Sequence, residues 1–114
     1  MKGKLTTHIL DTANGIPAEG VRIELFREGE KILETVSNQD GRSGQPLLEG
    51  AACVAGEYEI LFHLGDYYAR RGESPSGGRF LDRVPIRFHV LDGDAHYHVP
   101  LLASPWSYST YRGS

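Results

Sequence analysis

Short segments in which apolar and polar side chains alternate recur along the whole chain. In residues 4–11, Leu5 and Ile9 fall on one face, and Thr6 and His8 fall on the other. Alternation with a period of two is typical of a β-strand that buries one face. The same pattern, or a short apolar run between turns, predicts further strands over residues 21–26, 31–38, 46–49, 57–63, 84–90, 96–102 and 106–112.

Residues that favour turns separate these segments. Asp92-Gly93-Asp94 predicts a tight turn, after which residues 96–102 are expected to pair back on the preceding strand as a hairpin. Residues 66–71 are the one stretch expected to form a short helix. About eight strands at short, regular spacing with one helix predict an all-β protein, an antiparallel β-sandwich.

Composition narrows the class of protein. The chain has 114 residues, of which 39% are hydrophobic and 24% charged, so we expect one domain over residues 1–114 with a buried core. A formal net charge of -3 argues against a nucleic-acid partner, because no basic surface faces the phosphates. The absence of a long apolar stretch predicts no signal peptide and no membrane span, hence a cytoplasmic protein. Cys53, the only cysteine, cannot form an intrachain disulfide and is expected to be buried.

Three histidines are candidates for chemistry near neutral pH. His96 and His98 are two residues apart in a predicted strand, so their side chains point to the same side. Pro100, which has no backbone N–H, favours a sheet edge or a bulge at this point. By itself, such a pair is more often a solvated face than a site. His8 shares a semi-polar face with Thr6, and two imidazoles in one cleft would suit proton transfer if His8 and His98 meet.

Two arginines add a possible anchor for a polar ligand. Arg42 lies in the turn at residues 38–42, and Arg112 lies near the end of the chain. Both are solvated charges by default, although a guanidinium offers a planar set of donors that matches a carboxylate or an imide-like anion. The alternating pattern continues through Tyr111, which indicates that the end of the chain is tied down.

Four separated motifs stand out along the chain. They are Leu5-Thr6-Thr7-His8-Ile9-Leu10-Asp11-Thr12 followed by Gly15-Ile16-Pro17-Ala18, then Asn38-Gln39-Asp40-Gly41-Arg42, then His96-Tyr97-His98-Val99-Pro100-Leu101-Leu102 with Ser104-Pro105, and last Ser107-Tyr108-Ser109-Thr110-Tyr111-Arg112-Gly113-Ser114. In this order they resemble the motifs of the 5-hydroxyisourate hydrolases, the enzymatic relatives of transthyretin. The terminal Tyr-Arg-Gly-Ser is the motif that distinguishes these hydrolases from transthyretins, and the resemblance extends over essentially the whole chain.

The resemblance implies a transthyretin-like fold with two four-stranded sheets and one short helix. It also implies a homotetramer, a dimer of dimers, in which paired dimers enclose a central channel. The face of the sheet that would line this channel holds His8, His98, Ser109 and Tyr111. Transthyretin binds thyroid hormones in the channel, whereas the hydrolases narrow it and line it with His, Arg and the terminal motif.

The implied activity is hydrolysis of 5-hydroxyisourate to 2-oxo-4-hydroxy-4-carboxy-5-ureidoimidazoline, a step of urate and purine degradation, with no cofactor and no metal. By the same resemblance, the catalytic residues are His8, Arg42, His98 and Ser114. We expect His98, helped by His8, to activate water, and Arg42 to bind the substrate and stabilise the developing oxyanion.

Three further residues are implied in substrate binding. Tyr111 and Arg112 would shape the pocket, and His96 would lie nearby in a secondary role.

Two other functions compete with this interpretation. The first is a transthyretin-like carrier of a small aromatic ligand, although such carriers favour apolar walls over titratable ones. The second is a zinc site in which His8, His96 and His98 supply three imidazoles; no acidic ligand is evident. Of the remaining histidines, His89 is expected at the surface and His63 in a structural position.

Overall fold

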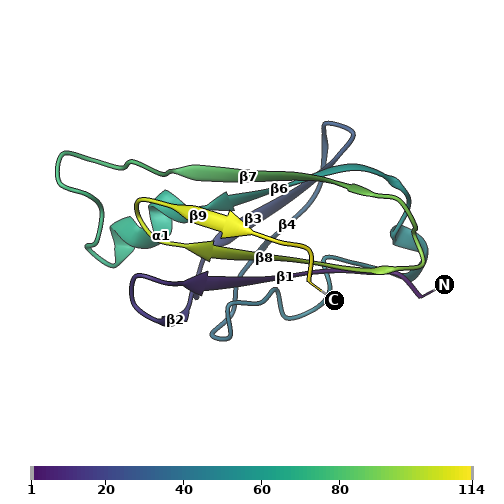
Figure 1. The fold of residues 1–114 in the computed structure, drawn as a ribbon, viewed down its shortest axis with the longest axis horizontal. Coiled ribbons are helices and arrows are strands. Elements are labelled where there is room, and N and C mark those ends of the chain that lie inside the picture. Colours follow the sequence, from purple (N-terminus) through teal and green to yellow (C-terminus); the bar gives the residue numbers. More distant parts are fainter. Residues whose placement is uncertain (1, 114) are drawn as a thin grey trace.

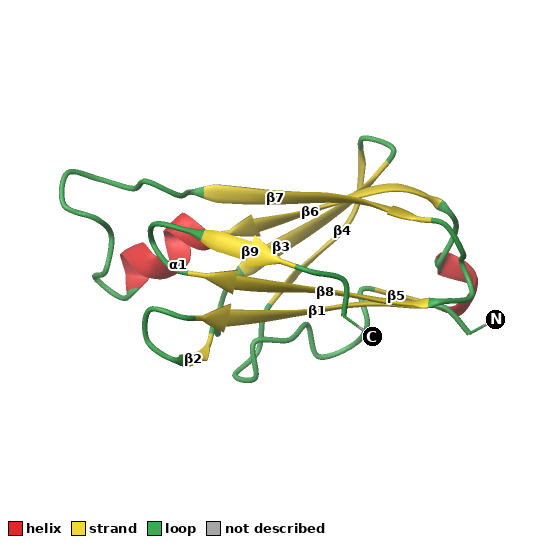
Figure 2. Ribbon diagram, in the orientation of Figure 1, coloured by secondary structure: helices red, strands yellow, loops and turns green. Residues whose placement is uncertain are grey.

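Two β-sheets pack face to face in the computed structural model, which describes residues 2–113 (Figure 1). Helix α1 lies at one end of the sandwich and the short 3-10 helix η1 at the other (Figure 2). The described elements are β1 (Lys4–Asp11), β2 (Ile16–Pro17), β3 (Arg22–Arg27), β4 (Glu30–Val36), β5 (Leu48–Glu49), η1 (Gly50–Ala52), β6 (Gly56–His63), α1 (Leu64–Arg70), β7 (Arg83–Val90), β8 (His96–Ala103) and β9 (Tyr108–Thr110). The predicted all-β sandwich with one short α-helix is confirmed. Within the described range, no helix has the length and apolar character needed to cross a membrane.

The first sheet is built around β1 and β8. Its order is β2-β1-β8-β9, and β5 pairs with the same edge of β1 as β2 does. Strands β1 and β8 are parallel over their full length, from Lys4 opposite His96 to Asp11 opposite Ala103, and their arrowheads point the same way in Figure 1. The other pairings among the described strands are antiparallel, so the sandwich contains one parallel pair that the sequence pattern did not predict.

The expected hairpin between residues 84–90 and 96–102 is wrong. Strand β7 belongs to the second sheet, of order β4-β3-β6-β7, and β8 belongs to the first. The turn at residues 92–94 therefore crosses between sheets. The Tyr97 hydroxyl accepts hydrogen bonds from the backbone N–H groups of Leu91 and Asp92, at 2.9 and 3.3 Å. These two N–H groups would otherwise have found their partners in the ladder of a hairpin.

Three other expectations need correction. The first sheet has five strands rather than four, because the two-residue strands β2 and β5 both pair with β1. The last strand covers only Tyr108–Thr110, and Trp106 lies in an exposed turn held by Ser104. Pro100 lies inside the sheet rather than at its edge, since β8 has neighbours on both sides.

The core lies between the two sheets and takes one face of each strand. Leu5 and Ile9 from β1 and Val99 and Leu101 from β8 face inward at 5% exposure or less. The second sheet contributes side chains of β3, β6 and β7, and all belong to one hydrophobic cluster. Burial of apolar surface on this scale is the main driving force for folding. The opposite faces of β1 and β8 are consequently left for polar residues.

Asp11 ties helix α1 to the end of β1. Its buried carboxylate accepts hydrogen bonds from the Tyr67 and Tyr68 hydroxyls, at 2.7 and 2.8 Å, and from the Asn14 side chain at 2.7 Å. Burial alone would raise the pKa of Asp11, but the hydrogen bonds from Asn14, Tyr67 and Tyr68 outweigh it and hold that pKa below its ordinary value. The ionised carboxylate is therefore part of the folded structure.

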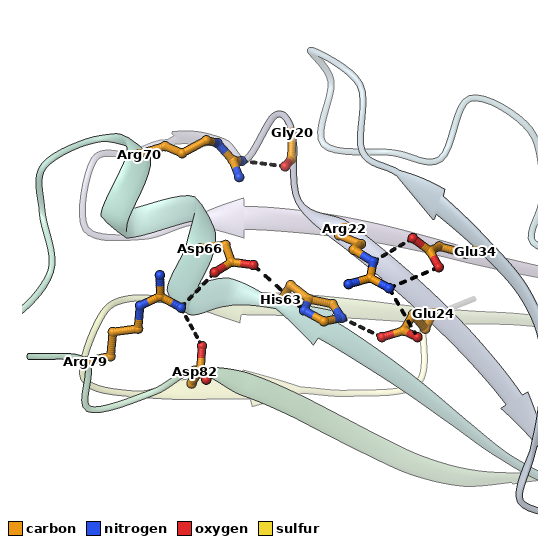
Figure 3. Close-up of polar contacts among 9 residues, drawn as sticks. All are labelled: Gly20, Arg22, Glu24, Glu34, His63, Asp66, Arg70, Arg79 and Asp82. Carbon is orange, nitrogen blue, oxygen red and sulfur yellow. Dashed lines mark hydrogen bonds and ion pairs between the residues drawn. The ribbon is translucent and has the colours of Figure 1, made fainter.

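A chain of charges covers the outer face of the second sheet (Figure 3). At its centre the buried Glu24 carboxylate and the buried His63 imidazole are 2.5 Å apart, and Arg22 and Asp66 flank them. Arg79 continues the chain from Asp66 into the α1–β7 connection, at 2.7 Å. His63, which is expected in a structural position, lies buried within this network.

Replacing Asp11 with Asn is expected to destabilise the fold by about 2–3 kcal/mol, because two buried tyrosine hydroxyls lose a charged acceptor. Urea unfolding of both proteins at one protein concentration measures the difference. Since the folded pKa of Asp11 lies below its ordinary 3.8, its contribution is complete above that pH and is lost as the pH falls further. The exposed Asp94→Asn should change stability by no more than about 0.5 kcal/mol; equal effects of the two substitutions would contradict this role of Asp11.

Candidate functional site

The parallel register of β1 and β8 gathers three histidines on the outward side of the first sheet. Thr6 lies opposite His98, and His8 lies opposite Pro100. His8 and His98 are therefore diagonal neighbours on this face, and His96 lies two residues before His98. His8 and His98 are partly buried, whereas His96 is exposed. We call the surface formed by Thr6, His8, His96 and His98 the histidine face.

Thr6 connects two of these imidazoles. Its Oγ1 lies 2.8 Å from Nδ1 of His98 and 2.9 Å from Nε2 of His96, and the two rings are 6.4 Å apart between centroids. A hydroxyl can donate one hydrogen bond and accept another, so Thr6 can satisfy both nitrogens at once. The sequence pattern placed Thr6 on this face but gave no sign of this role.

The turn at residues 38–42 brings Arg42 to the histidine face. The Asn38 carboxamide accepts hydrogen bonds from the backbone N–H groups of Asp40 and Arg42, at 2.9 and 3.1 Å, which closes the turn. Arg42 then forms a single β-bridge with His8. Two motifs far apart in the sequence thus meet beside one imidazole.

Gly41 permits this close approach. It has a φ of 76°, and a Cβ there would lie 2.4 Å from the Ile9 carbonyl oxygen and 3.3 Å from Cδ2 of His8. Its own carbonyl accepts a hydrogen bond from the Ile9 N–H, at 2.8 Å. A side chain at this position would push the turn away from β1, so glycine is required to hold Arg42 beside His8.

Burial and positive charge favour the neutral imidazoles. Burial lowers the pKa of His8 and of His98 below the ordinary 6.5, and the Arg42 guanidinium lowers both further. The His8 and His96 imidazoles act in the same direction on His98. The backbone and carboxylate of Asp40 oppose the shift of His8 without reversing it. At neutral pH His8 and His98 therefore present unprotonated nitrogens suited to accept a proton.

The C-terminal segment packs against His98. The Gly113 N–H donates to the His98 carbonyl at 2.8 Å, and a Cβ on Gly113 would lie 2.6 Å from Cδ2 of the imidazole. The ladder between β8 and this segment is interrupted between the pairs Leu101–Thr110 and His98–Gly113, where Pro100 has no N–H to donate. The pairs on both sides keep one register, so Pro100 marks a gap in the ladder and the bulge expected there is absent.

The predicted residues of this segment fall in different places. Tyr111 is 60% exposed and lies in the interruption of the ladder, opposite Pro100. Arg112 turns away from the histidine face: its Cζ lies 4.3 Å from the centroid of the inward-facing Tyr97 ring. Ser114 lies outside the described residues.

A small cavity adjoins the histidine face. It has a volume of about 140 Å³ and is lined by Thr6, Thr7, Arg42 and residues 43–46. A larger hollow of about 340 Å³ near Tyr67 contains no imidazole. Among residues 2–113, no three or more His, Cys, Asp or Glu side chains are grouped so that they could hold a metal ion. The Thr6 hydroxyl lies where the His96 and His98 nitrogens converge.

Comparison with known proteins decides the family. The profile described as "HIUase/Transthyretin family" matches residues 5–113, which is nearly the whole chain. The chain belongs to the HIUase/transthyretin family. Its four motifs are thus correctly assigned to this family, and the histidine face is the outer surface of a sheet in a family member.

One relative and two solved structures place the chain within the family. It is 53% identical to "5-hydroxyisourate hydrolase 2" of Rhizobium meliloti, over 98% of this chain and 97% of that protein. A crystal structure of (S)-allantoin synthase is 50% identical with a TM-score of 0.94, and it covers 99% of this chain but only 44% of its own. Sea bream transthyretin in complex with thyroxine is 28% identical with a TM-score of 0.85, over 96% of this chain and 94% of its own. The fold is therefore shared with (S)-allantoin synthase and with a transthyretin.

Replacing Arg42 with Gln should raise the pKa of both His8 and His98, because it removes a positive charge that opposes their protonation. Titration of the imidazole proton signals by NMR measures this shift, and both values should lie below 6.5 in the parent protein. The matched control is Arg83→Gln, on strand β7 of the other sheet, which should move neither value. Unchanged titration in Arg42→Gln would show that the guanidinium does not face these rings.

Proposed function

We propose that this protein hydrolyses 5-hydroxyisourate to 2-oxo-4-hydroxy-4-carboxy-5-ureidoimidazoline, a step of urate degradation. The observation that supports this most directly is the combination of His8, Arg42 and His98 on one sheet face. A close relative named 5-hydroxyisourate hydrolase matches the chain almost end to end. In this reaction water adds to a ring carbonyl carbon, the carbon–nitrogen bond of the six-membered ring breaks, and a carboxylate forms.

In this proposal His98 acts as the general base. Its lowered pKa keeps the imidazole neutral at physiological pH, so it can take a proton from the attacking water. The same proton can then pass to the ring nitrogen that leaves as the carbon–nitrogen bond breaks. His8, two residues along the neighbouring strand, helps to orient the water. General acid–base groups typically accelerate reactions by about 10²–10⁴-fold.

Arg42 binds the substrate and stabilises charge in the transition state. Negative charge develops on the attacked carbonyl oxygen, and the guanidinium of Arg42, whose backbone is bridged to His8, stabilises that charge. Its exposed side chain can also reach the polar edge of a planar heterocycle through paired N–H donors. The guanidinium thus serves two purposes, since it also keeps the base unprotonated.

The end of the chain completes the site in this proposal. Ser114 follows directly on Gly113, which contacts the His98 ring, and its hydroxyl would position water or substrate. Tyr111 would wall the pocket, and His96 would remain a neighbour of the base. The contribution of Arg112 is to fix the terminal segment, because its guanidinium lies over Tyr97 and bonds to the His96 carbonyl at 3.3 Å.

The site requires a second copy of the chain in this account. The histidine face lies on the outside of a sheet, where bulk water would screen the charges that catalysis uses. A homotetramer, a dimer of dimers, would place two such faces across a channel and exclude water from both. This assembly follows from the family resemblance. The partly buried Leu10 and Leu102 and the exposed Tyr111 provide apolar surface at the channel walls.

The proposal is tested by following the ultraviolet absorbance of 5-hydroxyisourate generated in place by urate oxidase. The protein should accelerate the decay above the spontaneous rate. His98→Ala should lose at least about 100-fold in kcat, and His8→Ala should also fall sharply, because each removes an imidazole from proton transfer. The control is His89→Ala, an exposed histidine on the other sheet, which should keep full activity.

Size-exclusion chromatography with light scattering should accompany the assay, so that loss of assembly is not mistaken for loss of chemistry. Decay at the spontaneous rate by a folded tetramer would contradict the proposal. Tight binding of an iodinated aromatic ligand by such a protein would then favour a transthyretin-like carrier.

A further inference from the structure

The Thr6 hydroxyl bridges two imidazoles and so fixes where their protons lie. Thr6 has one hydroxyl hydrogen, and its Oγ1 is within 2.9 Å of both Nδ1 of His98 and Nε2 of His96. If both contacts are hydrogen bonds, Thr6 donates to one ring and accepts from the other. Only two arrangements of the hydrogens satisfy this condition when both rings are neutral.

The two arrangements differ in the nitrogen that His98 presents outward. When Thr6 donates to His98 Nδ1, the proton of His98 is on Nε2, which then cannot accept another. When Thr6 accepts from the Nδ1–H of His98 and donates to Nε2 of His96, the Nε2 of His98 is unprotonated. Only the second arrangement lets His98 take a proton from water, and it persists after the transfer because the imidazolium keeps its Nδ1–H.

We propose that Thr6 is a positioning residue that, by linking Nδ1 of His98 to Nε2 of His96, holds His98 in the tautomer whose Nε2 is the base. This inference rests on the proposed function for its kinetic consequence, but the tautomer itself is independent of activity. In this arrangement Nε2 of His96 accepts the hydrogen bond that the Thr6 hydroxyl donates. A carboxylate commonly orients a catalytic imidazole, and here a hydroxyl and a second imidazole do so.

The charges around this link keep the His98 ring to a single proton. The groups that face His98 are Arg42 from the turn at residues 38–42, His8 from β1 and His96 from β8, and each disfavours a second proton on the ring. On the other side Gly113 packs against the ring, which limits its rotation and keeps Nδ1 directed at Thr6.

The test replaces Thr6 with Val, which has the same shape without the hydroxyl, and with Ser, which keeps it. In the parent protein, the ¹⁵N shifts of the His98 ring should report a protonated Nδ1 and a bare Nε2. Thr6→Val should shift the ring toward the Nε2–H tautomer and lower kcat about 10- to 100-fold with little change in KM, a part of the acceleration expected of a general base. Thr6→Ser should restore both the tautomer and most of kcat.

Two further variants separate positioning from simple loss of structure. Thr12→Val removes a threonine hydroxyl that bonds the Ala103 carbonyl, at 3.0 Å, at the far end of the same strand pair; it should leave the tautomer and kcat unchanged. His96→Leu keeps Thr6 but removes its acceptor, so Thr6 is free to donate to His98 and the ring should again shift toward Nε2–H.

The outcomes distinguish this inference from the proposed function. Suppose that the parent protein has no hydrolase activity, but that His98 is in the Nδ1–H tautomer and loses it in Thr6→Val. This result would overturn the proposed function and support the positioning role of Thr6. A bare Nδ1 on His98 in the parent protein, or full kcat in Thr6→Val, would overturn the link whatever the activity of the parent.

Discussion

The parallel pairing of β1 with β8 is the constraint on which the rest of the site depends. A register that sets Thr6 opposite His98 puts His8, His96 and His98 on one side and the core residues Leu5, Ile9, Val99 and Leu101 on the other. A shift by one residue would exchange these faces, so the buried apolar side chains hold the histidines in place. Hydrophobic burial on one side of the sheet thus fixes the polar geometry on the other.

The chain gives its histidines two opposite electrostatic settings. His63 lies against the Glu24 carboxylate, at 2.5 Å, in a network that ties α1 and its following loop to the second sheet. His8 and His98 instead lie near the Arg42 guanidinium, which favours their neutral forms. The cation keeps those two rings free to accept a proton, whereas Nε2 of His63 is already engaged by Glu24. The difference explains why only one of the two clusters is suited to base catalysis.

Local patterns predicted much of this fold and the candidate residues, but not the way distant segments meet. Period-two alternation predicted most strands, and the motif resemblance predicted the family and the residues His8, Arg42 and His98. The pairing of β1 with β8 was not predicted, because a turn such as Asp92-Gly93-Asp94 has the same composition whether it closes a hairpin or crosses between sheets. The positions of Thr6 beside His98 and of Gly41 beside His8 were not predicted either, since both are contacts between residues far apart in the sequence. The side chain of Arg112 faces Tyr97, which alternation alone could not indicate.

The central claim is that neutral imidazoles, kept so by burial and by Arg42, perform the proton transfer. The pH dependence of kcat/KM for 5-hydroxyisourate hydrolysis by the unmodified protein tests it most directly, because that profile reports the pKa values of the free enzyme. The account predicts that the midpoint of the decline of kcat/KM toward acid lies below pH 6.5, since the pKa values of His8 and His98 are lowered from 6.5. A midpoint at or above pH 6.5, or a kcat/KM that rises toward acid, would contradict it.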